Sequence, residues 1–210
     1  MLKVICVAVC ALALAGTAGA SLIGNGPPDQ SGGSDLNAFL EGDSFVVGSS
    51  VNVTQIAFWS DQVDQTDYAG STYWGIYSDA WGVPGSALFS GNPVLTGTAT
   101  GNTTFGLNEF SYQFVVSFTL SPGTYWLVLH NGPTNTIPST NFYWAWESGV
   151  SGNSQSQDLS VPSPWVANDA ALAFQLTSDL TAVPEPASMC MVGSGLLAAW
   201  LARRKLSARS

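Results

Sequence analysis

The chain has 210 residues, of which 46% are hydrophobic, and a net charge of −9, which suits one domain of ordinary size. Residues 21–182 hold thirteen of the fourteen acidic residues and no Lys or Arg, because the five basic residues all lie near the termini: Lys3, Arg203, Arg204, Lys205 and Arg209. Nucleic-acid binding, which depends on basic side chains at phosphates, is therefore excluded for this region.

Residues 1–20 have the features of a secretory signal peptide. Lys3 precedes an uncharged apolar run, and the small residues Ala18 and Ala20 occupy the minus-three and minus-one positions. The run is too short to span a bilayer, which needs about 20 residues. We expect a signal-peptide helix that signal peptidase removes by cleavage before Ser21.

The region between the termini predicts an all-β fold. Residues 21–43 are rich in Gly, Pro and Ser and are interpreted as a flexible lead, and residues 44–179 as the folded domain. About eight strands are predicted, separated by polar turns: 45–47, 51–60, 72–78, 87–89, 110–120, 124–130, 142–147 and 170–177. This spacing favours an antiparallel β-sandwich, jelly-roll-like, over a parallel sheet, which would need helical crossovers.

The clearest alternation lies in 110–120, where every second residue is apolar. A Ser-Pro-Gly turn follows and leads into the strand 124–130, so the two strands are predicted to pair as an antiparallel hairpin. If Tyr125, Leu127 and Leu129 face inward, alternation places the residues between them on the outer face.

Carbohydrate binding is the most specific functional hypothesis that the domain offers. Trp126 and His130 are predicted on the outer face of their strand, and Trp144 lies in a second aromatic strand. An exposed indole can stack on a sugar ring while polar neighbours bind the hydroxyl groups. The alternative is that most of the tryptophans fill the core, and that His130 is a hydrogen-bonded turn residue.

Asp61, Asp64 and Asp67 form the densest acidic segment, in a polar region between two predicted strands. Oxygen ligands of this kind suit Ca²⁺, although the spacing does not match the helical calcium loop. A solvated acidic loop is the simpler alternative. Calcium is the only cofactor that the sequence suggests. Zinc is not expected, because the domain has a single His and no Cys.

The domain lacks the residues of a hydrolytic triad, since His130 is its only histidine and its serines form no Gly-x-Ser-x-Gly turn. A glycosidase would need two carboxyl groups across a sugar, and Glu41, Glu109 and Glu147 are available, but no spacing selects a pair. We therefore expect a non-enzymatic protein. An extracellular carbohydrate-active enzyme on a jelly-roll scaffold is the alternative.

The C-terminal segment has three parts in a fixed order. Residues 180–186 form a linker that contains Val183, Pro184, Glu185 and Pro186. Residues 187–202 are uncharged and predict a short membrane helix of about 24 Å, and the tail 203–210 begins with Arg203, Arg204 and Lys205. The basic cluster is expected to stay cytoplasmic, which places the domain outside the inner membrane.

These three parts resemble the PEP-CTERM sorting signal of Gram-negative bacteria that make exopolysaccharide. The resemblance implies that an exosortase processes the tail and that the protein reaches the cell surface or the extracellular matrix. The order of aromatic strands between residues 46 and 177 is loosely similar to the sandwich ectodomains of PEP-CTERM proteins, which implies no particular activity. A plain tail anchor and a lipid-anchored eukaryotic protein are the alternatives, and the terminal arginines argue against the second.

The sequence therefore predicts an exported cell-surface or exopolysaccharide-matrix protein with a binding or structural role. Its expected partners are signal peptidase and exosortase during processing, the inner membrane before processing, and polysaccharide after export. A purely structural coat or adhesin subunit is a third possibility.

Overall fold

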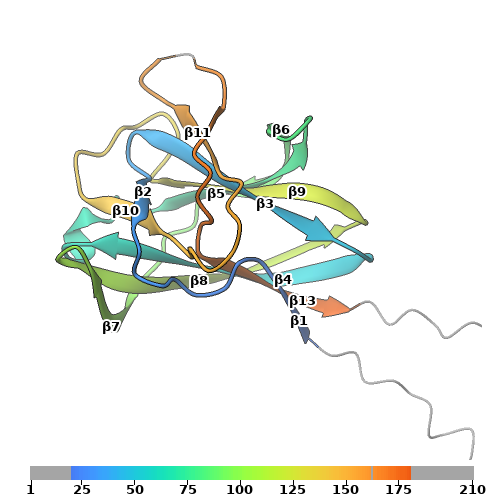
Figure 1. Ribbon diagram of the computed structural model, residues 1–210, viewed down its shortest axis with the longest axis horizontal. Coiled ribbons are helices and arrows are strands. Elements are labelled where there is room, and N and C mark those ends of the chain that lie inside the picture. The colour runs from blue at the N-terminus through green and yellow to red at the C-terminus, as the bar shows by residue number, and fades with distance from the viewer. Residues whose placement is uncertain (1–19, 162, 181–210) are drawn as a thin grey trace, which may run out of the picture. The chain divides into compact units, whose positions relative to one another are not determined.

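The computed structural model describes residues 20–161 and 163–180, which form two antiparallel sheets packed face to face (Figure 1). The predicted all-β, sandwich-like architecture is confirmed. The predicted signal-peptide helix, the linker that holds Val183–Pro186, the membrane helix and the basic tail lie outside the described residues. Within those residues no helix is long and apolar enough to cross a membrane.

The first sheet has β4 at its centre. One edge of β4 pairs with β8, which pairs with β7; the other edge pairs with β13 in its first part and with β10 in its last part. β1 and β2 complete the sheet beside β13 and β10. The bounds are β1 Ala20–Ile23, β2 Gly33–Asp35, β4 Val51–Gln62, β7 Thr98–Thr104, β8 Leu107–Leu120, β10 Phe142–Ala145 and β13 Phe174–Leu180.

The second sheet has the order β12-β11-β3-β9-β5-β6. Its strands are β3 Phe39–Val47, β5 Thr72–Asp79, β6 Pro84–Gly91, β9 Gly123–Asn131, β11 Gln155–Asp158 and β12 Val166–Ala167. The single helical turn of the described residues is the 3-10 helix η1, Gln65–Asp67.

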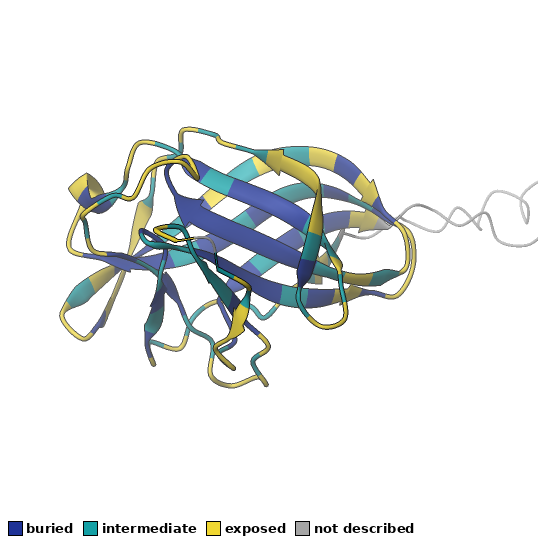
Figure 2. Ribbon diagram, turned by 90° about the horizontal axis from the view of Figure 1, so that it is seen from above, coloured by how far each residue is buried: buried dark blue, intermediate teal, exposed yellow. Residues whose placement is uncertain are grey.

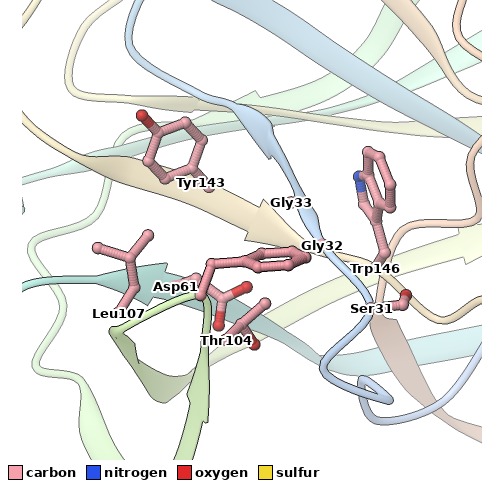
Figure 3. A pocket seen from close by; sticks show the side chains of 9 residues that line it. Ser31, Gly32, Gly33, Asp61, Thr104, Leu107, Tyr143 and Trp146 are labelled. Carbon is pink, nitrogen blue, oxygen red and sulfur yellow. The ribbon is translucent and has the colours of Figure 1, made fainter.

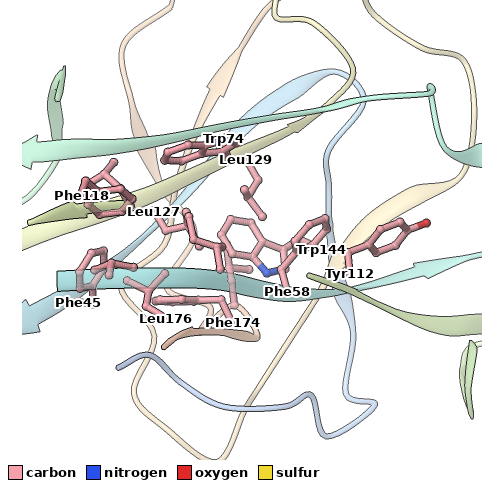
Figure 4. Packing of buried hydrophobic residues seen from close by; sticks show 14 of the residues in the cluster. Phe45, Phe58, Trp74, Tyr112, Phe118, Leu127, Leu129, Trp144, Phe174 and Leu176 are labelled. Carbon is pink, nitrogen blue, oxygen red and sulfur yellow. The ribbon is translucent and has the colours of Figure 1, made fainter. Parts of the chain in front are cut away.

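The core lies between the sheets and is rich in aromatic side chains (Figure 4). Phe58 stacks on Tyr112 with ring centroids 5.1 Å apart, and Trp74 stacks on Phe118 at 5.9 Å. The buried residues concentrate in the central strands, as the dark blue segments of Figure 2 show. Because aromatic residues bury large areas, this core can hold the two sheets together without a disulfide.

The alternation predicted for 110–120 is confirmed, but the predicted hairpin is wrong. In β8 the core-facing series includes Phe110, Tyr112 and Phe118, whereas Val115 is 85% exposed. β8 nevertheless pairs with β4 and β7, and β9 pairs with β3 and β5 in the other sheet. The Ser-Pro-Gly turn therefore carries the chain from one sheet to the other.

β9 is buried on both faces, which corrects the predicted outward orientation of Trp126 and His130. Leu127 and Leu129 face the main core, as expected. Trp126 and Val128 lie on the other face in a second apolar cluster, covered by partly buried residues that include Tyr73, Tyr77 and Trp165. Alternation assigned the two faces correctly, but the second face is covered by other segments and not by water.

The predicted flexible lead is also wrong, because residues 20–43 contribute strands to both sheets. β1 and β2 join the first sheet and most of β3 precedes residue 44. In the segment between β1 and β2, the Asn25 side-chain amide donates to the Asp43 carboxylate and to the Leu172 carbonyl. Gly and Pro in this segment provide tight turns in an ordered chain.

The two ends of the domain lie at one end of the first sheet. Ala20 pairs with Asp179, and Leu180 pairs with Val51 at the start of β4. β4 ends at Gln62, and twelve extended residues place that end roughly 36 Å away. Features near the end of β4 are therefore distant from the points where the chain enters and leaves the domain.

Candidate functional site

A pocket of about 400 Å³ lies at the end of the first sheet that is distant from the chain ends (Figure 3). Its walls are formed by the loop before β2, the end of strand β4, the β7–β8 hairpin, and β10 with the residues after it. The lining residues are Ser31, Gly32, Gly33, Asp61, Thr104, Phe105, Leu107, Tyr143 and Trp146. Its volume lies within the usual range of small-molecule sites.

Two buried polar side chains in this pocket have unused hydrogen-bonding atoms. Asp61 is 1% exposed and Thr104 is 4% exposed, and they lie side by side in Figure 3. Both carboxylate oxygens of Asp61 and the hydroxyl of Thr104 have no hydrogen-bond partner among the described residues. Buried polar atoms are nearly always hydrogen-bonded in folded proteins, so these atoms mark the pocket as a candidate binding site.

Burial raises the pKa of the Asp61 carboxyl to about 6, and the negative charge of Glu109 contributes to the rise. The Thr104 hydroxyl lies close enough to offset part of this rise without meeting the geometry of a hydrogen bond. Asp61 is thus mostly ionised above pH 7, although its surroundings disfavour the charge.

Glu109 lies directly opposite Asp61 on the neighbouring strand and is 2% exposed. Unlike Asp61, it has a partner for each carboxylate oxygen: Gln30 Nε2 donates at 2.7 Å and Asn102 Nδ2 donates at 3.1 Å. Glu109 is not among the residues that line the pocket. It therefore adds negative charge behind the pocket but does not present a free carboxyl to it.

The two glycines of the pocket allow close approach of the chain to functional side chains. A Cβ atom at Gly33 would lie 3.5 Å from Asp61 Oδ2 and 2.8 Å from Tyr143 Cβ. At Gly32 a Cβ atom would lie 2.6 Å from Trp146 Cε3. Larger residues here would displace the Trp146 ring and narrow the space beside the Asp61 carboxylate.

Phe105 projects from the tip of the β7–β8 hairpin, with 88% of its surface exposed and a backbone φ of +50°. Gly106 follows with φ +85°, so both central residues of the turn have positive φ, as in type I′ hairpin turns. Asn, Asp and Gly are favoured at such positions, and a bulky residue is strained there. Strained residues tend to cluster at functional sites, which is consistent with the position of Phe105 at the pocket.

Trp146 and Tyr143 are half-buried and complete the aromatic walls. The Trp146 indole donates to Ser34 Oγ at 2.9 Å, which fixes the plane of the ring. Trp146 also lines a second pocket of about 260 Å³, together with Asn168 and Asp169. The two hollows are therefore neighbours that share one indole.

The residues predicted to bind sugar do not form a surface. Trp126, His130 and Trp144 are all 0% exposed. The Trp126 indole donates to Asp79 at 2.9 Å and the Trp144 indole to the Ala173 carbonyl at 2.8 Å.

His130 is likewise held inside the domain and does not reach the surface. Its Nδ1 lies 2.9 Å from the carbonyl oxygen of Gly132, and its Nε2 lies 3.0 Å from that of Asn37. Because both ring nitrogens are engaged with the backbone, this residue ties two loops to β9. The prediction of a binding face around Trp126 is therefore wrong.

The three aspartates predicted to bind calcium have different structural roles. Asp61 lies on β4, which extends two residues beyond the predicted strand. Asp64 caps η1 by accepting from Thr66, whereas Asp67 accepts from the backbone amides of Val63 and Asn141. The described residues contain no group of three or more His, Cys, Asp or Glu side chains that could hold a metal ion.

Thr104, Phe105 and Trp146 line the pocket but were not predicted as site residues. The one local signal is Phe105-Gly106, a bulky residue before glycine at the centre of a hairpin turn. Trp146 carried no such signal, because it lines the pocket only through the path of the loop before β2.

Comparison with protein families identifies a match over residues 182–205, to the PEP-CTERM protein-sorting motif. The chain carries a PEP-CTERM sorting motif. The match covers Val183, Pro184, Glu185 and Pro186 as well as Arg203, Arg204 and Lys205, and it confirms the predicted resemblance. A PEP-CTERM motif implies that the protein is exported, processed by an exosortase and delivered to the cell surface. A search of curated proteins finds no match to this chain.

Proposed function

We propose that this PEP-CTERM protein is a carbohydrate-binding component of the cell surface or exopolysaccharide matrix of a Gram-negative bacterium. The proposal rests on the unpartnered Asp61 and Thr104 at the floor of a pocket with aromatic walls. Sugar-binding sites combine hydrogen-bonding groups for hydroxyls with aromatic rings that stack on the apolar face of the sugar. The pocket lies at the end of the first sheet opposite β1 and the end of β13, which suits a domain that is held at one end.

Binding is favoured over catalysis by the carboxyl groups of the site. Hydrolysis of a glycosidic bond needs two carboxyl groups that both reach the sugar. Asp61 and Glu109 are direct neighbours across two strands, but both oxygens of Glu109 are engaged by side-chain amides. One free carboxyl supports recognition of a ligand and leaves no second group for acid–base chemistry.

The proposal can be tested with a glycan-binding screen of the recombinant domain, residues 21–180. This region contains its own core and forms one compact unit, so it can be produced without the two ends. We expect binding by the native domain and at least a tenfold loss in Phe105→Ala, because the ring contributes a wall of the pocket. Phe105 is exposed, so its removal leaves the core intact.

Trp81→Ala is the matched control. Trp81 is also fully exposed, has a φ of +63° and precedes a glycine at a hairpin tip, but it does not line the pocket. The Trp81→Ala variant should bind glycans as the native domain does. Equal losses in the two variants, or self-association of the domain with no affinity for any glycan, would contradict the proposal.

A further inference from the structure

The pocket has the electrostatic character of a site for a cation. Asp61 faces the pocket and Glu109 lies behind it, and no Lys or Arg is present anywhere in residues 21–182. A buried carboxylate is costly unless it is paired with a positive charge or well hydrogen-bonded. Since residues 21–182 supply no Lys or Arg, a cationic ligand would provide the compensating charge.

The free hydrogen-bonding atoms match an ammonium group. The two oxygens of Asp61 and the oxygen of Thr104 can all accept hydrogen bonds, and an ammonium group has three donors. A neutral sugar hydroxyl donates a single bond and leaves the charge of Asp61 uncompensated. Charge-assisted hydrogen bonds are also roughly twice as strong as neutral ones.

The aromatic walls also favour an organic cation. Phe105, Tyr143 and Trp146 line the same pocket, and cations are attracted to the faces of such rings. Calcium fits less well, because it takes six to eight oxygen ligands and the pocket is lined largely by rings and glycines.

The position of Trp146 and the presence of a second pocket beside it are suited to a sugar chain. A six-membered ring with apolar C–H groups can stack on an indole, and Trp146 lines both the main pocket and the second one, which Asn168 and Asp169 also line. A sugar chain can therefore place one unit in the main pocket and continue past Trp146 to a second polar site.

We propose that the pocket selects a protonated amino sugar, with its ammonium group on Asp61 and Thr104 and its ring against Trp146. This inference rests on the proposed carbohydrate-binding function and narrows its ligand class. The ligand is a saccharide with a free amino group, in contrast to N-acetylated or uncharged saccharides of the same linkage.

Titration calorimetry of the domain with three β-1,4-linked oligosaccharides tests the inference: oligomers of glucosamine, of N-acetylglucosamine and of glucose. We expect glucosamine oligomers to bind at least tenfold more tightly than the other two. Asp61→Asn, which keeps the shape of the side chain and removes its charge, should abolish this preference. Circular dichroism verifies that the variant is folded.

Asp64→Asn is the control for general attraction of a cationic sugar to an acidic domain. Asp64 is exposed, lies three residues from Asp61 and is not part of the pocket, so this variant should keep the preference. Equal losses in the two aspartate variants would overturn the inference, and so would equally tight binding of lysine amide, which carries the amine without the sugar.

The outcomes separate the inference from the function on which it rests. Equal binding of all three oligomers would contradict selection of the amine and leave carbohydrate binding in place. Absence of binding to any glycan in the broader screen would contradict both.

Discussion

Among the residues that the structure describes, four other than glycine have a left-handed backbone. Two of these are fully or largely exposed aromatic residues at hairpin tips, Trp81 and Phe105. A left-handed conformation costs an ordinary residue roughly 1–2 kcal/mol. Neither ring recovers this cost by burial in the described domain. At Phe105 the neighbouring pocket offers a reason, since the ring forms one wall of a site with unpartnered buried oxygens.

Replacement of Phe105 by Asn should separate stability from binding. The Asn-Gly sequence is favoured in this turn, so we expect Phe105→Asn to raise the free energy of unfolding by about 1 kcal/mol. The same change should reduce glycan affinity, because it removes an aromatic wall. Urea denaturation and the glycan screen measure the two effects, and a loss of stability in this variant would refute the argument from strain.

Three buried carboxyl groups predict that the domain is most stable in mildly acidic solution. Burial raises the pKa of Glu41 to about 8 and those of Asp43 and Asp61 to about 6. Each folded-state pKa lies above the unfolded value, so the folded domain binds extra protons at intermediate pH, and stability falls as the pH rises through 6 and 8. The melting temperature should therefore decrease from pH 5 to pH 9.

Glu41→Gln identifies the main contributor to this dependence. Glutamine can still accept from Asn168, which donates to Glu41 at 3.2 Å, and it carries no charge to bury. We expect this variant to be more stable than the native domain at pH 9, by roughly 4 kcal/mol, and to differ by less than about 1 kcal/mol at pH 5. A native melting temperature that is constant or increases over this pH range would contradict the prediction.

At the scale of elements, the sequence predicted the strands better than their partners. Every predicted strand coincides with an observed one, because alternation and β-branched or aromatic residues mark them. The missed strands are short or polar, as in β2, β12 and the Gly- and Thr-rich β7. Pairing depends on contacts between distant segments, so a local turn could not reveal that β8 and β9 lie in different sheets.

The orientation of side chains was predictable only where one face of a strand meets water. β9 has apolar residues on both faces, so alternation could not distinguish Trp126 in the second cluster from an exposed indole. The pocket was less predictable still, since Asp61, Phe105 and Trp146 come from three separate elements.

The observed order of the lead segment can be tested at two of its glycines. Gly24 has φ +126°, and a Cβ atom there would lie 2.5 Å from the Phe174 carbonyl oxygen. Gly26 has φ +98° and open space around it. We expect Gly24→Ala to cost at least about 2 kcal/mol of unfolding free energy and Gly26→Ala about 1 kcal/mol. Equal, negligible effects in both variants would mean that the lead is flexible after all.

The chain ends and the candidate pocket lie at opposite ends of the first sheet. The PEP-CTERM motif begins just after β13, and the expected signal-peptide cleavage before Ser21 falls at the start of β1, beside β13. Both processing steps therefore concern the same end of the first sheet. The candidate pocket lies at the other end of that sheet.

Mass spectrometry of the exported protein tests the processing at both ends. We expect a mature chain that starts at Ser21 and has lost the predicted membrane segment 187–202, because signal peptidase and exosortase each remove one end. A mature C-terminus at Ser210 would show instead that the segment is retained as a plain anchor.

We predict that ligands bind at the pocket around Trp146 and not at the buried face of Trp126. Indole N–H resonances of the domain, followed by NMR during titration with glucosamine oligomers, distinguish these positions. We predict that the Trp146 resonance shifts in a saturable manner while those of Trp126, Trp144 and Trp81 stay in place. Saturable shifts at Trp81 or Trp126, with Trp146 unchanged, would contradict the assignment of the site.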